Sequence, residues 1–288
     1  SRLGTTELTL LGQQITMSEN RVLPLAGVHN FRDYGGYAVA GGGRLRQGVL
    51  FRPGQHLEAT PDDLAAVDAL GIANIIDLRG DNERLLYPCR RAPGFAAAVL
   101  YMPGETTGAG SAPHVEAAAA QLDVPAASLA AGAAAEARQR MTNSYAVMPF
   151  RPVLAGSFGH YFAALGRGEG ASLVHCLAGK DRTGLAVALL QALMGVHADD
   201  IMADYLLTNT AGDVERRIEA GGRLVRAHAS VPLDDDAVRV VMSVEPAYLD
   251  TAFAAIRERH GSVEAYAEAA CGVTPALRAA IAAQLIEG

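Results

Sequence analysis

Short apolar runs alternate with helical patterns through the first two thirds of the chain. A helix is expected near Thr60, which can cap it, with Pro61 in its first turn and Gly71 after its end. Strands are expected at Val49–Arg52, Ala73–Leu78 and Ala97–Met102, and a shorter apolar run, Leu173–Val174, precedes a later helical pattern. This order predicts an α/β fold, a sheet flanked by helices with its working loops at the carboxyl ends of the strands.

The last third of the chain has the apolar spacing of helices throughout. Helices are expected at Ala198–Thr208, Asp213–His228, Pro246–Arg259 and Pro275–Ile286. Near the other end, the segment 8–17 suggests an extended strand, and the glycines at 41–43 suggest a hairpin turn. We expect a single domain over residues 1–288.

The candidate chemistry lies at 172–184, Ser-Leu-Val-His-Cys-Leu-Ala-Gly-Lys-Asp-Arg-Thr-Gly. An apolar run, a tight loop and the start of a helix make a nest of backbone N–H groups for a phosphate-sized anion. Arg182 can grip two phosphate oxygens, and the positive surroundings favour the thiolate of Cys176, a nucleophile. Gly179 permits a close approach of the backbone that a side chain would block. Thr183 can place a hydroxyl near the sulfur, and His175 can hold the loop by hydrogen bonds beneath it.

These residues resemble the signature of the cysteine-dependent protein tyrosine phosphatase superfamily. The form His-Cys-x-x-Gly-Lys-Asp-Arg-Thr-Gly is similar to a bacterial branch related to mycobacterial protein tyrosine phosphatase B. The segments 30–37, 51–54 and 75–79 also resemble that branch. One departure is Pro53, where the family more often has Ser. Arg32 and Asp33 are expected in the wall of the site, because their segment is similar to the family's.

The resemblance implies a phosphomonoester hydrolase that forms a cysteinyl-phosphate on Cys176 and needs no metal or cofactor. The phosphate would be bound by Arg182 and by backbone N–H groups of the loop, which also contains Leu177, Ala178, Gly179 and Lys180. Two carboxylates are candidates for the general acid. Asp181 lies in the loop and Asp77 ends a predicted strand, and either could instead be a structural ion-pair partner.

Lys180 bears on the substrate. A second cation beside the loop favours substrates with more than one phosphate. The Gly-Lys-Asp-Arg form resembles phosphatases that act on phosphotyrosine and on phosphoinositides, so a phosphorylated protein, including phosphoserine or phosphothreonine forms, or a phosphoinositide is the expected partner. Contact with a membrane would be transient. The alternative for Lys180 is a side chain that simply points to solvent.

An alanine-rich insert occupies about 104–148. Two helices, His114–Leu122 and Pro125–Met141, are expected to dock weakly because alanine buries little apolar area. The insert is either a peripheral helical hairpin or a lid over the site. The related branch has a lid in this part of the chain, which favours that interpretation.

Composition narrows the function classes. The net charge of −7 argues against a nucleic-acid binder, and Cys89, Cys176 and Cys271 lack metal-ligand spacing. The aspartates at 234–236 indicate a helix start rather than a cation site. Without an apolar run long enough to span a membrane, we expect a soluble protein, cytoplasmic or secreted. Two rival classes are a rhodanese-like sulfurtransferase and a non-catalytic phosphate-binding module.

Overall fold

The computed structural model describes residues 7–10, 13–16, 21–107, 129–228 and 234–288. Its main sheet has the strand order β3-β5-β8-β6-β7, in which β3 is antiparallel and the other strands are parallel. These strands are β3 (Arg32–Asp33), β5 (Leu50–Arg52), β8 (Ala171–His175), β6 (Ile72–Asp77) and β7 (Ala98–Leu100). The central position of β8 puts the loop after His175 in the middle of the carboxyl edge of the sheet. This confirms the predicted α/β fold.

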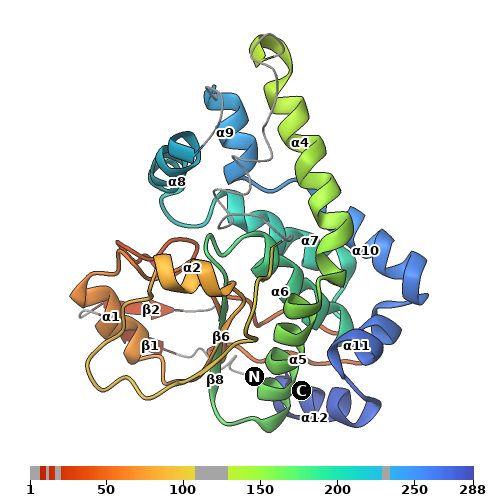
Figure 1. Cartoon of the computed structure of the whole chain (residues 1–288). Coiled ribbons are helices and arrows are strands. Elements are labelled where there is room, and N and C mark those ends of the chain that lie inside the picture. The colour runs from red at the N-terminus through yellow and green to blue at the C-terminus, as the bar shows by residue number, and fades with distance from the viewer. Residues whose placement is uncertain (1–6, 11–12, 17–20, 108–128, 229–233) are drawn as a thin grey trace.

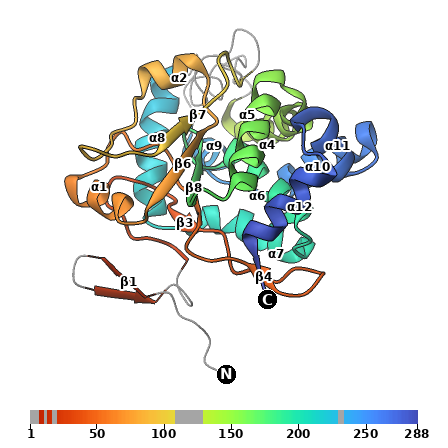
Figure 2. The same ribbon diagram turned by 90° about the horizontal axis from the view of Figure 1, so that it is seen from below.

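Two small sheets lie outside the main one. The first pairs β1 (Glu7–Leu10) with β2 (Gln13–Thr16), in the region expected to be extended. In the second, β4 (Arg44–Leu45) pairs with β9 (Ile286–Glu287), so the C-terminal residues lie beside the hairpin predicted around 41–43, as Figure 2 shows.

Helices follow most of the predicted patterns. The first, α1 (Pro61–Asp68), begins with the expected Thr60 cap, because the Thr60 hydroxyl accepts from Asp63 N and the Asp63 carboxylate accepts from Thr60 N. The other helices are α2 (Asp81–Leu86), α4 (Leu129–Val147), α5 (Pro152–Arg167), α6 (Asp181–Leu193), α7 (Ala198–Leu206), α8 (Val214–His228), α9 (Asp235–Met242), α10 (Pro246–His260), α11 (Val263–Cys271) and α12 (Pro275–Leu285), with short 3-10 turns at Met148–Phe150 and Leu207–Asn209.

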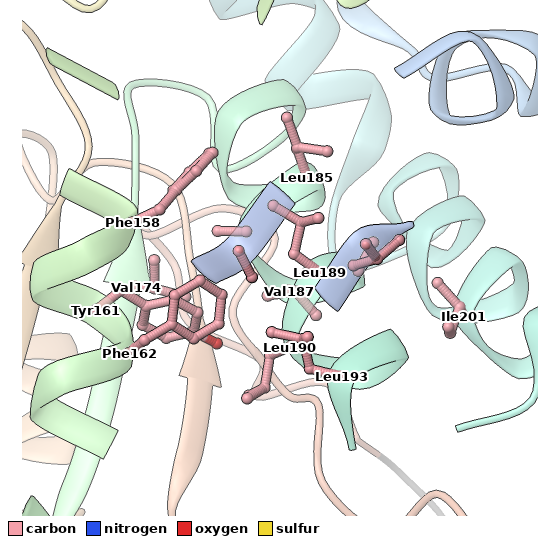
Figure 3. Close-up of a cluster of buried hydrophobic side chains, with 14 of the residues drawn as sticks. Phe158, Tyr161, Phe162, Val174, Leu185, Val187, Leu189, Leu190, Leu193 and Ile201 are labelled. Atoms are coloured by element: carbon pink, nitrogen blue, oxygen red, sulfur yellow. The ribbon is translucent and has the colours of Figure 1, made fainter. Parts of the chain in front are cut away.

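Helix α6 is buried in the hydrophobic core. From Leu185 to Leu190 its sequence is apolar around the whole helix, as expected of a fully buried helix. Figure 3 shows its leucines packed against aromatic side chains of α5 and against β8. The labelled side chains are Phe158, Tyr161, Phe162, Val174, Leu185, Val187, Leu189, Leu190, Leu193 and Ile201. The N-terminus of α6 is therefore fixed relative to the carboxyl end of β8.

The alanine-rich helix α4 docks more firmly than its composition predicts. Ala137, Met141 and Tyr145 on its C-terminal half are buried. Two large side chains on one face thus supply the buried area that alanine lacks. The predicted helix at His114–Leu122 lies outside the described residues.

Helices α4, α8 and α9 gather at one end of the molecule in Figure 1. Helices α4 and α9 share a buried apolar cluster with the loop after β8, formed by Ala137, Leu177, Ala237, Val238, Val240, Val241 and Met242, and Ile218 of α8 packs against it. The cluster places these helices directly against that loop. Among the described residues, no helix is both long and apolar enough to cross a lipid bilayer.

Candidate active site

Cys176 lies at the base of the loop between β8 and α6, and only 1% of its surface is exposed. The loop closes tightly at Gly179, where φ is +65° and a Cβ would come within 2.3 Å of the Pro53 carbonyl oxygen. Asn30 Nδ2 donates to the Gly179 carbonyl at 2.8 Å. As the sequence predicts, glycine is required here, and the loop runs directly into the positive end of the α6 dipole.

Arg182, in the first turn of α6, is buried and held from several sides. Its Nη2 donates to Glu83 Oε1 at 2.7 Å, its Nη1 also pairs with Glu83, and Nη1 donates to Thr106 Oγ1 at 2.8 Å. Burial lowers the pKa of Arg182, but the Glu83 carboxylate raises it above its usual value. The guanidinium is therefore charged and oriented. Glu83 was not predicted, because its role depends on packing between α2 and α6.

A buried polar cluster supports the loop from below. Asp77 accepts from Arg79 Nε at 2.8 Å and from Arg79 Nη2 at 2.7 Å, and its Oδ2 lies 3.8 Å from His175 Nε2. Burial raises the pKa of Asp77, but His175 and Arg79 lower it well below its usual range. His175 Nδ1 donates to the Cys176 carbonyl at 3.0 Å, which matches the supporting role predicted for His175. Burial lowers the pKa of His175 to about 4.

Asp181, the first residue of α6, is fully buried in a different cluster. Its Oδ1 accepts from the Tyr145 hydroxyl at 2.7 Å, and Tyr205 donates to the Tyr145 oxygen at 2.8 Å. Burial raises the pKa of Tyr145 well above its usual value, and the charge of Asp181 adds to this, so the phenol keeps its proton. Neither tyrosine was predicted, since they come from α4 and α7.

Lys180 is the only lysine of the chain, and it is 2% exposed. Its Nζ donates to the carbonyls of Val241 at 2.5 Å and Ser243 at 3.0 Å, and lies 3.3 Å from Asp181 Oδ1. The ammonium therefore holds the C-terminal end of α9. The side chain does not simply point to solvent, which was the alternative to a phosphate contact.

Behind the loop, Asp204 of α7 joins two arginines of the sheet. Arg52 Nη1 lies 2.8 Å from Asp204 Oδ2, and Arg32 Nε lies 3.5 Å from Oδ1. Asp33 accepts from the backbone N–H groups of Gly35 and Gly48. Arg32 and Asp33 are thus buried and bound to other protein groups, and they do not form an exposed wall of the site. The hydroxyl of Thr183 is buried and has no hydrogen-bond partner among the residues that the structure describes.

A pocket of about 420 Å³ lies beside the loop. Most of its lining is apolar, with polar groups from a few residues. It is lined by His29, Gly54, Gln55, Leu57, Glu58, Tyr87, Leu177, Ala178, Arg217, Ala220, Gly221, Arg223 and Met242. Of the described residues, α8 and α9 provide its helical wall, whereas the insert at 104–148 reaches the site through Thr106 and Tyr145. The part of the predicted lid at 108–128 lies outside the described residues.

Comparison with known proteins agrees with this geometry. Residues 23–287 match the model of the tyrosine phosphatase family. A Cupriavidus necator protein described as "Putative tyrosine-protein phosphatase" is 33% identical over 241 residues, which cover 83% of this chain and 80% of that protein. "Triple specificity protein phosphatase PtpB" of Mycobacterium tuberculosis is 30% identical over 262 residues, which cover 85% of this chain and 92% of that protein. The family match over nearly the whole chain and the identity to both relatives show that the chain belongs to the tyrosine phosphatase family.

Proposed function

We propose that this phosphatase hydrolyses phosphotyrosine through a cysteinyl-phosphate on Cys176. The observation that carries the proposal is the position of Cys176 beneath a loop whose arginine, Arg182, is already oriented by Glu83. A phosphoryl group in that loop meets backbone N–H groups, the α6 dipole and a guanidinium at once. Fixed positive groups of this kind stabilise charge that develops during phosphoryl transfer.

The reaction has two steps. The Cys176 sulfur attacks phosphorus while the bond from phosphorus to the ester oxygen breaks, and the departing oxygen takes a proton from the general acid. Water then attacks the cysteinyl-phosphate, and the carboxylate left by the first step accepts its proton. The sulfur leaves as a thiolate, to which the Thr183 hydroxyl is free to donate. Inorganic phosphate is released.

We assign the general acid to Asp181. Asp77 is held by two hydrogen bonds from the Arg79 side chain and has a lowered pKa, both of which oppose donation of a proton. Asp181 is the first residue of α6 and directly follows the loop. Its carboxylate accepts a hydrogen bond from the Tyr145 hydroxyl and lies beside the Lys180 ammonium.

The pocket beside the loop bears on the substrate. Apolar side chains of Leu57, Leu177 and Met242 line it and suit the ring of an aryl phosphate. The name of the M. tuberculosis relative describes triple specificity, so phosphoserine, phosphothreonine and phosphoinositides are also proposed as substrates to be compared with phosphotyrosine.

Hydrolysis of p-nitrophenyl phosphate tests the proposed function. The wild type should release phosphate, vanadate should inhibit it and a chelator should leave it unchanged, because no step uses a metal. The Cys176→Ser variant should be inactive, while Cys271→Ser, which alters a cysteine away from the loop, should be active. Full activity of Cys176→Ser would overturn the mechanism. Turnover of thiosulfate instead of the aryl phosphate would favour the sulfurtransferase.

A further inference from the structure

The pocket beside the catalytic loop contains a buried cation to which no group in the described part of the chain is hydrogen-bonded. Arg217, on α8, lines the pocket and is only 5% exposed. Its Nε, Nη1 and Nη2 atoms are buried and have no hydrogen-bond partner among the described residues. A buried guanidinium is normally paired with an anion, because its desolvation is otherwise uncompensated. Asp181 acts on Arg217 only through its charge, so a hydrogen-bonding anion for this arginine, which the described residues do not provide, is expected from a ligand.

A second buried polar atom belongs to another residue of the pocket lining. His29 lines the pocket, and its Nε2 is buried without a partner in the described part of the chain. Burial lowers the pKa of His29, and the positive charge of Arg217 lowers it further, so the two side chains interact electrostatically. Together they offer an anion a charged fork and a neutral imidazole.

The other charged groups of the lining, Arg223 and Glu58, do not fill this role, and neither does Lys180 of the catalytic loop. Arg223 is exposed and pairs with Glu219 at 2.7 Å. Glu58 is exposed, so solvent screens its repulsion of a bound anion. Lys180 donates to the carbonyls at the end of α9, which uses two of its three donors. Arg217 is thus the cation best placed for a second anionic group.

We propose that Arg217 and His29 form a second anion subsite, which binds a phosphate or carboxylate adjoining the phosphotyrosine that occupies the loop. This inference rests on the proposed function and defines its substrate class as phosphotyrosine peptides with a neighbouring acidic or phosphorylated residue. The apolar lining favours such a peptide over a phosphoinositide. An inositol ring would place its hydroxyls against Leu57, Ala220 and Met242, whose side chains offer no hydrogen bonds.

Two otherwise identical peptides test the subsite, one with a single phosphotyrosine and one with a second phosphotyrosine next to it. For the wild type, kcat/KM should be about tenfold higher for the doubly phosphorylated peptide, because one hydrogen bond between charged groups changes affinity by about this factor. Arg217→Gln should abolish this preference and His29→Gln should reduce it. The matched control is Arg216→Gln, which removes an exposed cation from the same helix and should keep the preference.

Several outcomes separate the possibilities. An Arg217→Gln protein that retains the preference would overturn the subsite. The melting temperature of Arg217→Gln should not fall, since the variant loses a buried charge that has no hydrogen-bond partner among the described residues. If the melting temperature does fall, Arg217→Lys keeps the charge and should retain part of the preference. If Arg217→Gln instead alters the ratio of rates for short-chain phosphatidylinositol bisphosphate and monophosphate, with the peptide ratio unchanged, the peptide assignment is wrong.

The subsite can also fail or succeed independently of the proposed chemistry. Binding of the two peptides to Cys176→Ser, measured by fluorescence anisotropy, needs no turnover. Tighter binding of the doubly phosphorylated peptide, lost in Cys176→Ser/Arg217→Gln, would support the subsite even if p-nitrophenyl phosphate were not hydrolysed by the wild type. Equal binding of both peptides would contradict it.

Discussion

Asp77 and Asp181 are both buried near the loop, but their partners give them different properties. The Arg79 side chain donates to both oxygens of Asp77, which stabilises the carboxylate and lowers its pKa. Asp181 accepts from Tyr145, whose hydroxyl is itself bound by Tyr205. At the residue scale, these partners give Asp77 a structural role beneath the loop, and they support our proposal that Asp181 exchanges the proton with the substrate.

Leaving-group dependence distinguishes the two carboxylates. In Asp181→Asn, kcat/KM, which reports the first chemical step and not hydrolysis of the intermediate, should fall by about 10²–10⁴ for phenyl phosphate, with a much smaller loss for p-nitrophenyl phosphate, whose leaving group needs no proton. Asp77→Asn should lower both rates by the same factor and should destabilise the protein by about 3–5 kcal/mol, because it breaks a buried ion pair. Steady-state rates and thermal unfolding measure these effects. The reverse pattern would make Asp77 the acid.

At the scale of elements, the position of α9 depends on Lys180. The ammonium donates to the carbonyls of Val241 and Ser243, at the negative end of the helix dipole. The same side chain is two residues before Arg182 and lies beside Asp181. One side chain thus couples the catalytic loop to a helix that lines the pocket.

Hydrogen exchange measures this coupling. In Lys180→Met, backbone amides of α9 (Asp235–Met242) should exchange roughly tenfold faster or more, because charge-assisted hydrogen bonds to the helix end are lost. Arg239→Gln is the control, since it removes an exposed cation of α9 whose ion pair contributes little to stability. Unchanged exchange in Lys180→Met would mean that Lys180 does not hold the helix, and would favour a direct contact with substrate.

For the molecule as a whole, two buried histidines make stability depend on pH. The rings of His56 and His175 stack with centroids 5.9 Å apart, and burial lowers their pKa values to about 3 and about 4. Both bind protons more readily in the unfolded chain, so their contribution is complete above the unfolded pKa of ~6.5 and is lost as the pH falls. Asp33 acts in the opposite direction, because burial raises its pKa to about 6.

Comparing variants isolates the histidine contribution. Between pH 7 and pH 5, the free energy of unfolding should fall by about 2 kcal/mol more in the wild type than in His56→Gln, which has no group to protonate at that position. His160→Gln, at an exposed site, should follow the wild type. Urea unfolding at each pH gives these values. Parallel curves for the wild type and His56→Gln would show that His56 is not buried in its neutral form.

The local parts of the site could be predicted from sequence, and the long-range parts could not. Cys176, Gly179 and Arg182 belong to one strand-loop-helix unit, so their spacing together with the flanking residues predicts an anion-binding loop. Glu83 and Asp204 are distant in sequence from the loop. Their ion pairs with Arg182 and with Arg52 exist only once helices and sheet have packed together. No short motif identifies such carboxylates.

Long-range packing also explains why the docking of the alanine-rich helix α4 could not be predicted from its sequence. Composition predicts weak docking of α4, but Met141 and Tyr145 fix its C-terminal half, and Tyr145 reaches Asp181. The residues that form the wall of the pocket, Arg217 among them, likewise come from α8, whose helical pattern was predicted without its orientation.

The central claim is that phosphate passes through Cys176. Rapid mixing of the wild type with p-nitrophenyl phosphate, denaturation within one turnover and mass spectrometry of the peptides measure this directly. We expect the mass of one phosphoryl group on the peptide that contains Cys176, and none in Cys176→Ser. An aryl phosphate that is hydrolysed with a phosphoryl group on another residue, or with none on Cys176 at any time within the turnover, would contradict the account.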